Sequence, residues 1–387
     1  MNAFALPTPP ALWQNIPMAG ISLLHTEWSM GWGGQEIRIV QEMREFRRLG
    51  YRVRLACRAG SRIGEEATKL EFPVDHLPFR GPADLWTAWR LSRMLRAHGV
   101  QIVHTHSSVD GWCAGMAARL AGVPVVRSRH LSSHVRGGLN ARLVYSVLAD
   151  RVISSGRHIR EQLLAAGAGD PSRHVSVPAG ADEARFHPGV DAAPVRAELG
   201  LHPGDRVVGM VAVLRSWKGH EFFLRAARLL HAEDPGMVFL IVGDGPTRQN
   251  IEQWIREWDL TSCVRLLGHR ADVPELMKAM SVCVLPSLKN EATSQVLPQA
   301  MLVGTPVVSS SAGGLTEVVE DGVRGRVVEP GDPEALAAAI RAVFRDQEAT
   351  RVMAEEARRF AVEELTFRRQ IERTAAVYDG LLSLSGS

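Results

Sequence analysis

Two basic side chains in the second half of the chain have the type and spacing to bind phosphate. Arg215 and Lys218 stand three positions apart, after the apolar run 207–213 and at the predicted start of a helix. Cations in this place can clamp a diphosphate, because charge-assisted contacts to phosphate oxygens are strong and helix N-termini favour anions. Taken singly, either residue could also be a solvated helix end.

A polar loop further along the chain adds a carboxylate. Glu291 lies just before a predicted helix at 295–303, whose N-terminal amides and dipole favour an anion. The amides at this helix start belong to Thr293, Ser294, Gln295 and Val296. We therefore expect Glu291 to accept hydrogen bonds from sugar hydroxyls beside a bound phosphate, with Gln299 two turns later on a similar face.

Two glycine-containing turns also follow predicted strands. Gly243 belongs to the turn 242–246, and the turn 267–270 ends with Arg270. Glycine lets a ligand approach the backbone closely. A planar base could lie against the second of these turns.

The first half carries its own glycine-rich loop. Gly33 and Gly34 stand at the predicted start of a helix, where they could face phosphate. A dinucleotide-binding fingerprint needs a third glycine, but Glu36 occupies that position, and the next strand ends without the expected acid. This motif therefore does not indicate an oxidoreductase.

Polar residues at other strand ends of the first half are further candidates, Glu27, His104 and His106 for binding an acceptor and His130 as a catalytic residue. Glu27 lies in the glycine-rich loop, His104 and His106 end one predicted strand, and His130 follows the next. A structural histidine is the alternative for each. A metal site at His104 and His106 is conceivable, but adjacent-but-one positions without a fixed carboxylate partner argue against it. We expect no metal.

Short β-branched runs alternate with amphipathic stretches along the chain, which indicates α/β domains with parallel sheets. The predicted strands are 21–26, 53–57, 102–105, 123–127 and 152–154, then 207–213, 238–242, 264–267, 282–285 and 306–309. The predicted helices are 34–49, 82–98, 109–121, 139–149 and 156–166, then 218–231, 246–258, 272–279, 295–303 and 314–320.

A segment rich in turn-forming residues, 177–188, separates the two sets. We expect an acceptor-binding domain at 1–188, beginning with a loose arm at 1–20, and a donor-binding domain at 189–366. The last helix, within 367–387, should pack back on the first domain. Doubly wound sheets bind ligands beyond the carboxyl ends of their strands, so the site should lie in a cleft between the domains.

The composition is that of a globular protein, with 45% hydrophobic and 22% charged residues in 387. Four scattered cysteines argue against a disulfide framework or a structural zinc site. The start of the chain is a poor signal peptide, and no apolar run reaches the roughly 20 residues that span a bilayer. We expect a cytoplasmic protein.

Charge divides unevenly between the halves. Residues 1–188 hold 23 basic and 15 acidic side chains, a net +8, and the rest holds 22 and 27, a net −5. This favours an anionic partner for the first half, or reflects an arginine-rich surface. The stretch 85–96 interleaves tryptophan and arginine, so it either lies on the inner membrane face or packs its tryptophans on the sheet. We expect no nucleic-acid partner.

Taken together, these motifs resemble the family-4 retaining glycosyltransferases of the GT-B fold, which pairs two Rossmann-like doubly wound domains across a cleft. The resemblance rests on Arg215 with Lys218, the turns at Gly243 and Arg270, Glu291 followed eight positions later by Gln299, and the glycine pair 313–314 followed by Glu317. It extends from residue 21 to the last helix.

This resemblance implies roles for individual residues. Arg215 and Lys218 hold the donor diphosphate, Glu291 contacts the transferred sugar, and the glycine-rich loop faces the donor phosphates. His130 lies near the transferring sugar, and His106 lies near the acceptor. The family needs no metal or other cofactor.

Two positions depart from the family's pattern. Gln299 stands where the family has the glutamate that grips the ribose, and an amide offers one acceptor and one donor group in place of two acceptor oxygens. Val213 stands at the first basic position, so Arg215 supplies that charge from a shifted place. Both changes bear on the identity of the donor nucleotide.

The sequence therefore predicts a retaining glycosyltransferase. The donor is a nucleoside-diphosphate sugar, with a UDP-sugar favoured over a GDP-sugar. The acceptor is a hydroxyl of a glycan or lipid-linked molecule, in surface polysaccharide or lipopolysaccharide synthesis. A nucleotide-sugar epimerase and a non-catalytic sugar-nucleotide-binding protein are the alternatives.

Overall fold

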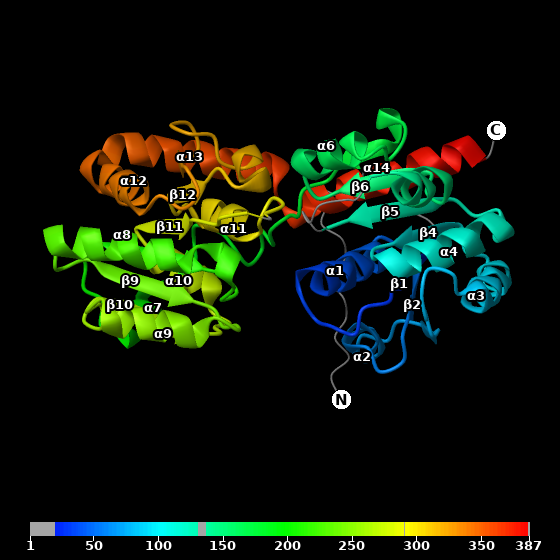
Figure 1. The fold of residues 1–387 in the computed structure, drawn as a ribbon, viewed down its shortest axis with the longest axis horizontal. Coiled ribbons are helices and arrows are strands. Elements are labelled where there is room, and N and C mark those ends of the chain that lie inside the picture. The colour runs from blue at the N-terminus through cyan, green and yellow to red at the C-terminus, as the bar shows by residue number, and fades with distance from the viewer. Residues whose placement is uncertain (1–19, 131–136, 290, 386–387) are drawn as a thin grey trace.

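The computed structural model describes residues 20–130, 137–289 and 291–385. They form two α/β domains joined end to end (Figure 1). The strands of the first domain are β1 (Ser22–Glu27), β2 (Arg52–Cys57), β3 (Val74–His76), β4 (Ile102–Thr105), β5 (Val125–Arg129), β6 (Arg151–Ser154) and β7 (His174–Ser176). Those of the second are β8 (Val207–Val211), β9 (Val238–Val242), β10 (Val264–Gly268), β11 (Val282–Leu285), β12 (Val307–Ser310) and β13 (Arg326–Val328).

Helices cover both faces of each sheet (Figure 1). The first domain contains α1 (Gly34–Arg48), α2 (Arg62–Lys69), α3 (Leu85–Ala97), α4 (Ser108–Ala121), α5 (Leu139–Arg142) and α6 (Arg157–Ala165). The second contains α7 (Ala193–Glu198), α8 (His220–Glu233), α9 (Arg248–Glu257), α10 (Val273–Ala279), α11 (Val296–Val303), α12 (Pro333–Arg345) and α13 (Gln347–Glu364), and the chain ends in α14 (Phe367–Ser385).

Both sheets are parallel and follow one plan. The first has seven strands in the order β3-β2-β1-β4-β5-β6-β7, and the second has six in the order β10-β9-β8-β11-β12-β13. The strand order reverses between β1 and β4 and between β8 and β11, the points at which such sheets bind ligands. The predicted GT-B fold of two doubly wound domains is confirmed.

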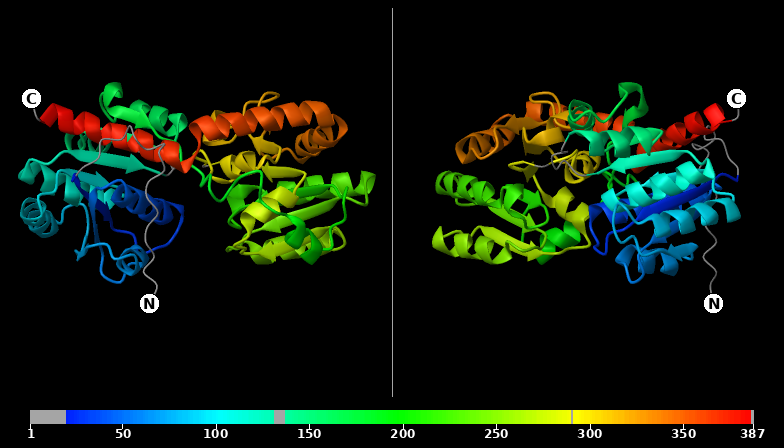
Figure 2. Two further views of the ribbon diagram at one scale, coloured as in Figure 1. Left: turned by 180° about the vertical axis from the view of Figure 1, so that it is seen from behind. Right: turned by 45° about the vertical axis from the view of Figure 1, so that its right-hand side comes forward.

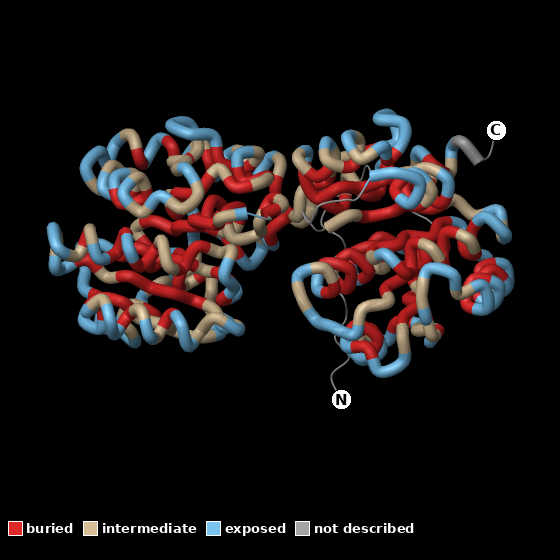
Figure 3. The backbone as a smooth tube through the Cα atoms, viewed as in Figure 1, coloured by how far each residue is buried: buried red, intermediate tan, exposed pale blue. Residues whose placement is uncertain are grey.

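Strand residues alternate between two cores in the first domain. Leu23 packs with α1 and α14 on one face, whereas Leu24 packs with α3 and α4 on the other. Ile102 and Val103 divide in the same way. This alternation follows from the pleat of a strand and explains why the strands read as continuous apolar runs. Figure 3 shows these buried strands between more exposed helices.

The structure differs from the predicted elements where they are short or irregular. It adds the three-residue strands β3, β7 and β13, as well as α2, α7, α12 and α13. The predicted helix 139–149 is α5 followed by a π-helical turn over Leu143–Val147, and 314–320 is a 3-10 helix, η5 (Gly313–Glu317). Of the predicted N-terminal arm, residues 1–19 lie outside the described part.

The chain passes between the two domains twice, and the two connecting segments lie side by side. The Ala181 amide donates to the Leu365 carbonyl at 2.8 Å, and the Phe367 amide donates back to the Ala181 carbonyl at 2.7 Å. Beyond this point α14 runs along the first domain (Figure 2), where Gln370 Nε2 donates to Glu42 Oε1 at 2.7 Å. The end of the chain is therefore part of the first domain's core. Among the described helices, none is both long and apolar enough to cross a membrane.

Candidate active site

A close backbone approach brings Lys218 to Glu291 where the strand order of the second sheet reverses. Gly219 adopts a φ of +82°, and a Cβ atom there would lie 1.9 Å from the Pro286 carbonyl oxygen. Only glycine permits this contact between the loops that follow β8 and β11. Lys218 Nζ consequently lies 2.6 Å from Glu291 Oε1, to which Ser287 Oγ also donates at 2.7 Å.

A second close approach supports the backbone of Glu291. The Gly314 amide donates to the Glu291 carbonyl at 3.1 Å, and a Cβ atom on Gly313 would lie 2.2 Å from the same oxygen. Glu291 is only 4% exposed. Its carboxylate is therefore fixed by a cation and a hydroxyl before any ligand arrives.

Arg215 does not join this pair. It is exposed, and its guanidinium lies over the ring of Trp217 at 5.0 Å from the centroid. It precedes the 3-10 helix η4 (Ser216–Lys218), which directs Lys218 towards Glu291. The structure thus places one predicted cation in the site and the other at its edge.

The loop before α11 contacts the first domain. Thr293 Oγ1 donates to the Ser155 carbonyl at 2.8 Å, and Gln295 Nε2 donates to the Gly180 carbonyl at 3.4 Å. Ser294 has a φ of +33°, which is unusual for a residue with a side chain and is often found at functional sites. Its Oγ accepts from the Val296 amide at 3.4 Å.

Gln299 faces the space between the domains. Together with Gln295 it lines a cavity of about 680 Å³, bounded by the second half of α1, the linker and the start of α14. Gln41 and Arg44 of α1 line the same cavity. The position that departs from the family pattern is therefore at an interdomain cavity and not in the core.

The turns after β9 and β10 meet, but the Arg270 side chain is occupied. The Gly243 amide donates to the Gly268 carbonyl at 2.8 Å. Arg270 forms paired contacts with Glu198, at 2.6 and 2.7 Å, and with Asp272, at 2.8 and 2.6 Å. Two carboxylates therefore hold the guanidinium, and the expectation that the base stacks near Arg270 stays a prediction. The backbone of the turn remains the candidate.

In the first domain, Glu27 organises the glycine-rich loop. Its carboxylate accepts from the Ser29 amide at 2.9 Å, from Ser107 Oγ at 2.5 Å and from Gln35 Nε2 at 2.5 Å. Burial raises the pKa of Glu27. Since Glu27 is fully buried and its carboxylate is engaged by these three groups, it holds the loop and does not reach an acceptor, which corrects the prediction.

Gly33 and Gly34 lie where the sequence indicates, at the N-terminus of α1. Gly33 is the residue before the helix, and its amide donates to Glu36 Oε2 at 2.8 Å, so the acid at the third position of the motif caps the helix. Gly34 begins α1 and is open on its Cβ side. Glu36, which stands where a dinucleotide-binding fingerprint has its third glycine, therefore has a structural role in this loop.

The histidines gather at the ends of β1, β4 and β5. His104 is fully buried and bonds Tyr378 and Ser128, so it supports the site from behind and does not contact an acceptor, which corrects the prediction. His106 is 3% exposed, and its ring lies between His25 and the half-buried His130. Only His130 of this group is placed to contact a ligand directly.

Asp110 belongs to the same region but has no place among the predicted site residues. It accepts from Thr26 Oγ1 at 2.8 Å and from the amides of His106 and Ser107 at 2.9 Å each. Burial, followed by repulsion from Glu27, raises its pKa to about 7. Its position three residues after Ser107, as in a capping box, is the sequence signal for this role.

Glu317 is the other important residue to which the sequence assigned no role. Its two carboxylate oxygens accept from the amides of Arg157 and His158, each at 2.6 Å. These amides begin α6, so a carboxylate of the second domain caps a helix of the first. Gly156 makes this possible, because a Cβ there would lie 3.2 Å from Glu317 Oε1.

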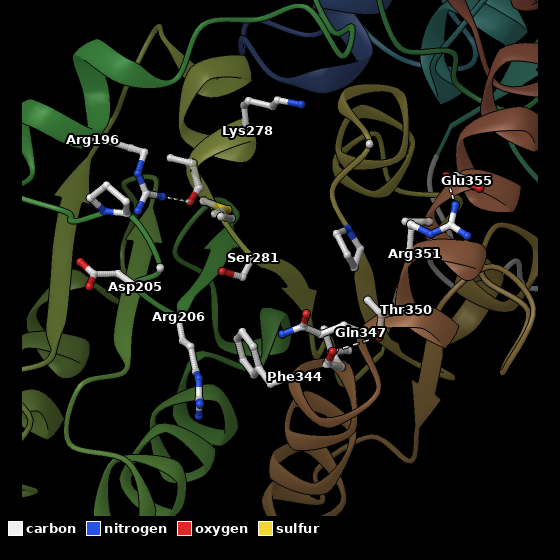
Figure 4. A pocket seen from close by; sticks show the side chains of 18 of the residues that line it. Arg196, Asp205, Arg206, Lys278, Ser281, Phe344, Gln347, Thr350, Arg351 and Glu355 are labelled. Carbon is white, nitrogen blue, oxygen red and sulfur yellow. Dashed lines mark hydrogen bonds and ion pairs between the residues drawn. The ribbon is translucent and has the colours of Figure 1, made fainter.

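Another pocket of the described residues lies elsewhere. It measures about 830 Å³ and is lined by residues of α12, α13 and the connections before β8 and β11, away from the carboxyl ends of the strands (Figure 4). Arg351 is paired there with Glu348 and Glu355, and Arg196 donates to backbone carbonyls. These cations are satisfied internally, so the pocket is not the candidate site.

Two parallel, doubly wound domains that meet at their ligand-binding edges define the GT-B class of glycosyltransferases. Sequence comparison identifies the family. Residues 32–185 match Glycosyltransferase Family 4, and residues 191–360 match Glycosyl transferases group 1. The chain belongs to this family and is a glycosyltransferase.

Individual relatives agree. The chain is 29% identical over 350 residues to the D-inositol 3-phosphate glycosyltransferase of Mycolicibacterium gilvum, covering 81% of this chain and 77% of that protein. It is 30% identical over 277 residues to the Escherichia coli UDP-Gal:alpha-D-GlcNAc-diphosphoundecaprenol alpha-1,3-galactosyltransferase, covering 68% and 71%. These relatives favour transfer over the epimerase and the non-catalytic binder.

Solved structures share the fold. A glycosyltransferase from Rickettsia africae ESF-5 matches with a TM-score of 0.85 at 18% identity, covering 94% of this chain and 99% of that one. Anabaena Alr3699/HepE, in complex with UDP and glucose, matches with a TM-score of 0.79 at 23% identity, covering 93% and 100%.

We expect the Glu317 contact to stabilise the closed arrangement of the two domains. Glu317→Ala leaves two amides at the start of α6 without their acceptor, which should weaken closure by about 1–3 kcal/mol. We expect a larger radius of gyration in small-angle X-ray scattering. Glu320→Ala, which removes an exposed carboxylate of the same segment, is the control. Identical scattering from the Glu317 variant and the wild type would contradict a closing role for this contact.

Proposed function

We propose that this protein is a retaining glycosyltransferase that transfers a sugar from a nucleoside diphosphate to a hydroxyl of a glycan or lipid-linked acceptor. The observation that carries the proposal is the Lys218–Glu291 pair at the β8–β11 reversal, beside the N-terminus of α11. The cation and the helix start suit the diphosphate of a sugar nucleotide, and the carboxylate beside them suits its sugar.

The diphosphate binds to Lys218 and to the amides of the loop from Thr293 to Val296. Lys218 exchanges Glu291 for a phosphate oxygen, while Ser287 continues to bond the carboxylate. Arg215 can swing from Trp217 onto the same phosphates, because its guanidinium is exposed. These cations stabilise the charge that develops as the diphosphate leaves, so the proposal includes no metal.

Transfer with retention is proposed from the resemblance to the family-4 retaining glycosyltransferases, and a same-face step requires no nucleophile from the protein. The bond between the anomeric carbon and the diphosphate oxygen breaks, and the acceptor oxygen forms its bond on the same face. The acceptor's proton passes to the departing phosphate oxygen. Glu291 and His130 hold the sugar during this step, and positioning of the acceptor supplies much of the rate enhancement.

A UDP-sugar is the favoured donor, with a GDP-sugar as the alternative. The name of the Escherichia coli relative includes a UDP-sugar and a lipid-linked diphosphate acceptor, and Anabaena Alr3699/HepE was solved with UDP. The ribose lies at the cavity lined by Gln299, and the base lies against the backbone near Gly243 and Gly268. The proposed setting is surface polysaccharide or lipopolysaccharide synthesis in the cytoplasm.

Helix α3 supports contact with a membrane. Leu85, Trp86 and Trp89 are 68%, 46% and 53% exposed, which corrects the interpretation that these tryptophans pack on the sheet. Arg90 lies over Trp86 at 5.2 Å and Arg93 over Trp89 at 5.1 Å. An exposed face that combines tryptophan with arginine suits an anionic bilayer surface, on which a lipid-linked acceptor would be presented.

Glu291 is expected to be essential for turnover. Glu291→Ala removes the carboxylate that contacts the sugar, so nucleoside diphosphate release that depends on an acceptor should fall by at least about 100-fold. The fold should survive, as judged by circular dichroism, since Gly314 bonds only the backbone of Glu291. Glu334→Ala, at an exposed position of the same domain, is the matched control. Near-normal turnover would defeat the assignment of the site.

Gln299 is expected to tune donor affinity. Gln299→Glu supplies two acceptor oxygens for the ribose hydroxyls, so affinity for the preferred nucleotide sugar should stay the same or rise by up to about tenfold. Thermal shift across a panel of UDP- and GDP-sugars, followed by calorimetry, measures this. A large loss of affinity would indicate that Gln299 recognises something other than ribose.

The α3 surface is expected to bind anionic lipid. Replacing Trp86 and Trp89 together by serine should reduce co-sedimentation with phosphatidylglycerol vesicles by about tenfold, because the apolar contact is lost. Val352→Ser, at an exposed apolar position of the second domain, should have no effect. Wild-type binding that is absent, or equal for phosphatidylglycerol and phosphatidylcholine vesicles, would refute the membrane contact.

A further inference from the structure

Four histidines form a connected group at the ligand-binding edge of the first sheet. His25 and His104 are direct partners in the register of β1 and β4. His25 Nδ1 lies 2.9 Å from His106 Nε2, and His106 Nδ1 lies 3.1 Å from His130 Nε2. The rings of His25, His106 and His130 are stacked in pairs, at interplanar angles of 7° and 14°. A hydrogen-bonded row therefore runs from the core to the site.

All of these imidazoles are neutral. Burial lowers the pKa of His25 to about 3 and lowers the pKa values of His104, His106 and His130 well below the usual histidine range. The positive charge of Arg38 lowers the last three pKa values further, and that of Arg127 does so for His104 and His130. Each ring consequently carries one N–H donor and one lone pair.

A metal site is the alternative explanation for this cluster, since nitrogens of His25, His104 and His106 lie within 4.8 Å of one another. Both ring nitrogens of His104 already have partners, Tyr378 Oη at 2.6 Å and Ser128 Oγ at 2.7 Å. The nearby Arg38 and Arg127 also oppose a cation. The geometry accordingly favours a row of hydrogen bonds over a coordination site.

The protons in such a row can point in either direction, and the buried end decides which. His25 Nε2 is buried and has no hydrogen-bond partner among the described residues. If each ring donated its N–H towards the core, from His130 to His106 to His25, this nitrogen would carry an N–H without an acceptor. Buried N–H groups without an acceptor are rare in proteins. If each ring instead donates towards the site, from His25 to His106 to His130, His25 Nε2 is unprotonated and carries only a lone pair.

We propose that His25 and His106 are positioning residues that hold His130 as its Nδ1–H tautomer. His25 Nδ1–H donates to His106 Nε2, and His106 Nδ1–H donates to His130 Nε2. His130 then offers its Nδ1–H as a donor and has no free lone pair. This inference rests on the proposed function, in which His130 faces the transferred sugar, and it identifies His130 as a hydrogen-bond donor to a sugar oxygen and excludes it as a general base.

Imidazole nitrogen spectra of the unliganded protein test the direction of the row. Long-range ¹H–¹⁵N correlation distinguishes a protonated from an unprotonated ring nitrogen, and the His130→Ala variant identifies the His130 signals among the 14 histidines. We expect His130 to be protonated on Nδ1 only. Protonation on Nε2, or an imidazolium signal at neutral pH, would overturn the proposal without any measurement of activity.

Breaking the row tests its consequence for transfer. In His25→Leu the donor to His106 is lost, so His130 should become a mixture of tautomers, with kcat reduced about tenfold and donor KM changed less than about twofold. His25→Gln, whose amide can donate in the same place, should restore both. His76→Leu, an exposed histidine on β3, should leave His130 unchanged.

These measurements separate two kinds of failure. If His25→Leu leaves the His130 tautomer unchanged, the positioning role is wrong. If the tautomer responds as expected but His130→Ala keeps full turnover, the positioning role stands and the proposed contact of His130 with the sugar is wrong. Should His25→Leu fail to fold, the wild-type spectrum still tests the proton direction.

Discussion

The contact between Lys218 and Glu291 is the interaction on which the donor site depends. A lysine that is largely shielded from water needs a partner, and Glu291 provides one at 2.6 Å. This pair exists only because two glycine-containing loops pass closer to neighbouring carbonyls than any side chain would allow. When a diphosphate replaces Glu291 on Lys218, one anion substitutes for another, so the lysine need not be rehydrated and the carboxylate is released towards the sugar.

The two sheets share one topological feature, and they meet at the edges where it lies. In each sheet the strand order reverses beside the first strand, which opens a crevice between loops that diverge in opposite directions. Two contacts among the described residues help to hold these crevices together. Thr293 bonds the end of β6, and Glu317 caps α6. Both are polar contacts at the ends of elements, and such contacts can break and reform as domains open and close at lower cost than a packed apolar interface.

Sequence alone identified the fold and the chemical groups, but not which groups meet. The longer strands and their loops were visible because apolar runs and glycines mark them, whereas three-residue strands such as β3 and β13 carry too few residues to show a period. Arg270 and Glu27 each have one partner from a distant segment, Glu198 and Ser107, which the sequence pattern did not reveal. The exposure of Trp86 was equally hidden, because an amphipathic pattern does not reveal which of its faces has a neighbour.

Tyr378 is a residue that supports the site from a distant part of the sequence. It lies on α14, more than 270 positions after the histidine that it contacts, and its ring packs among Phe46 and Tyr51 in the core of the first domain. Its hydroxyl is held at His104 Nδ1, so the last helix helps to fix the end of β4 and, through the register of β1 and β4, the position of His25. The chain crosses twice between the domains, and the second crossing therefore does more than close the structure. It completes the polar core from which His130 is oriented.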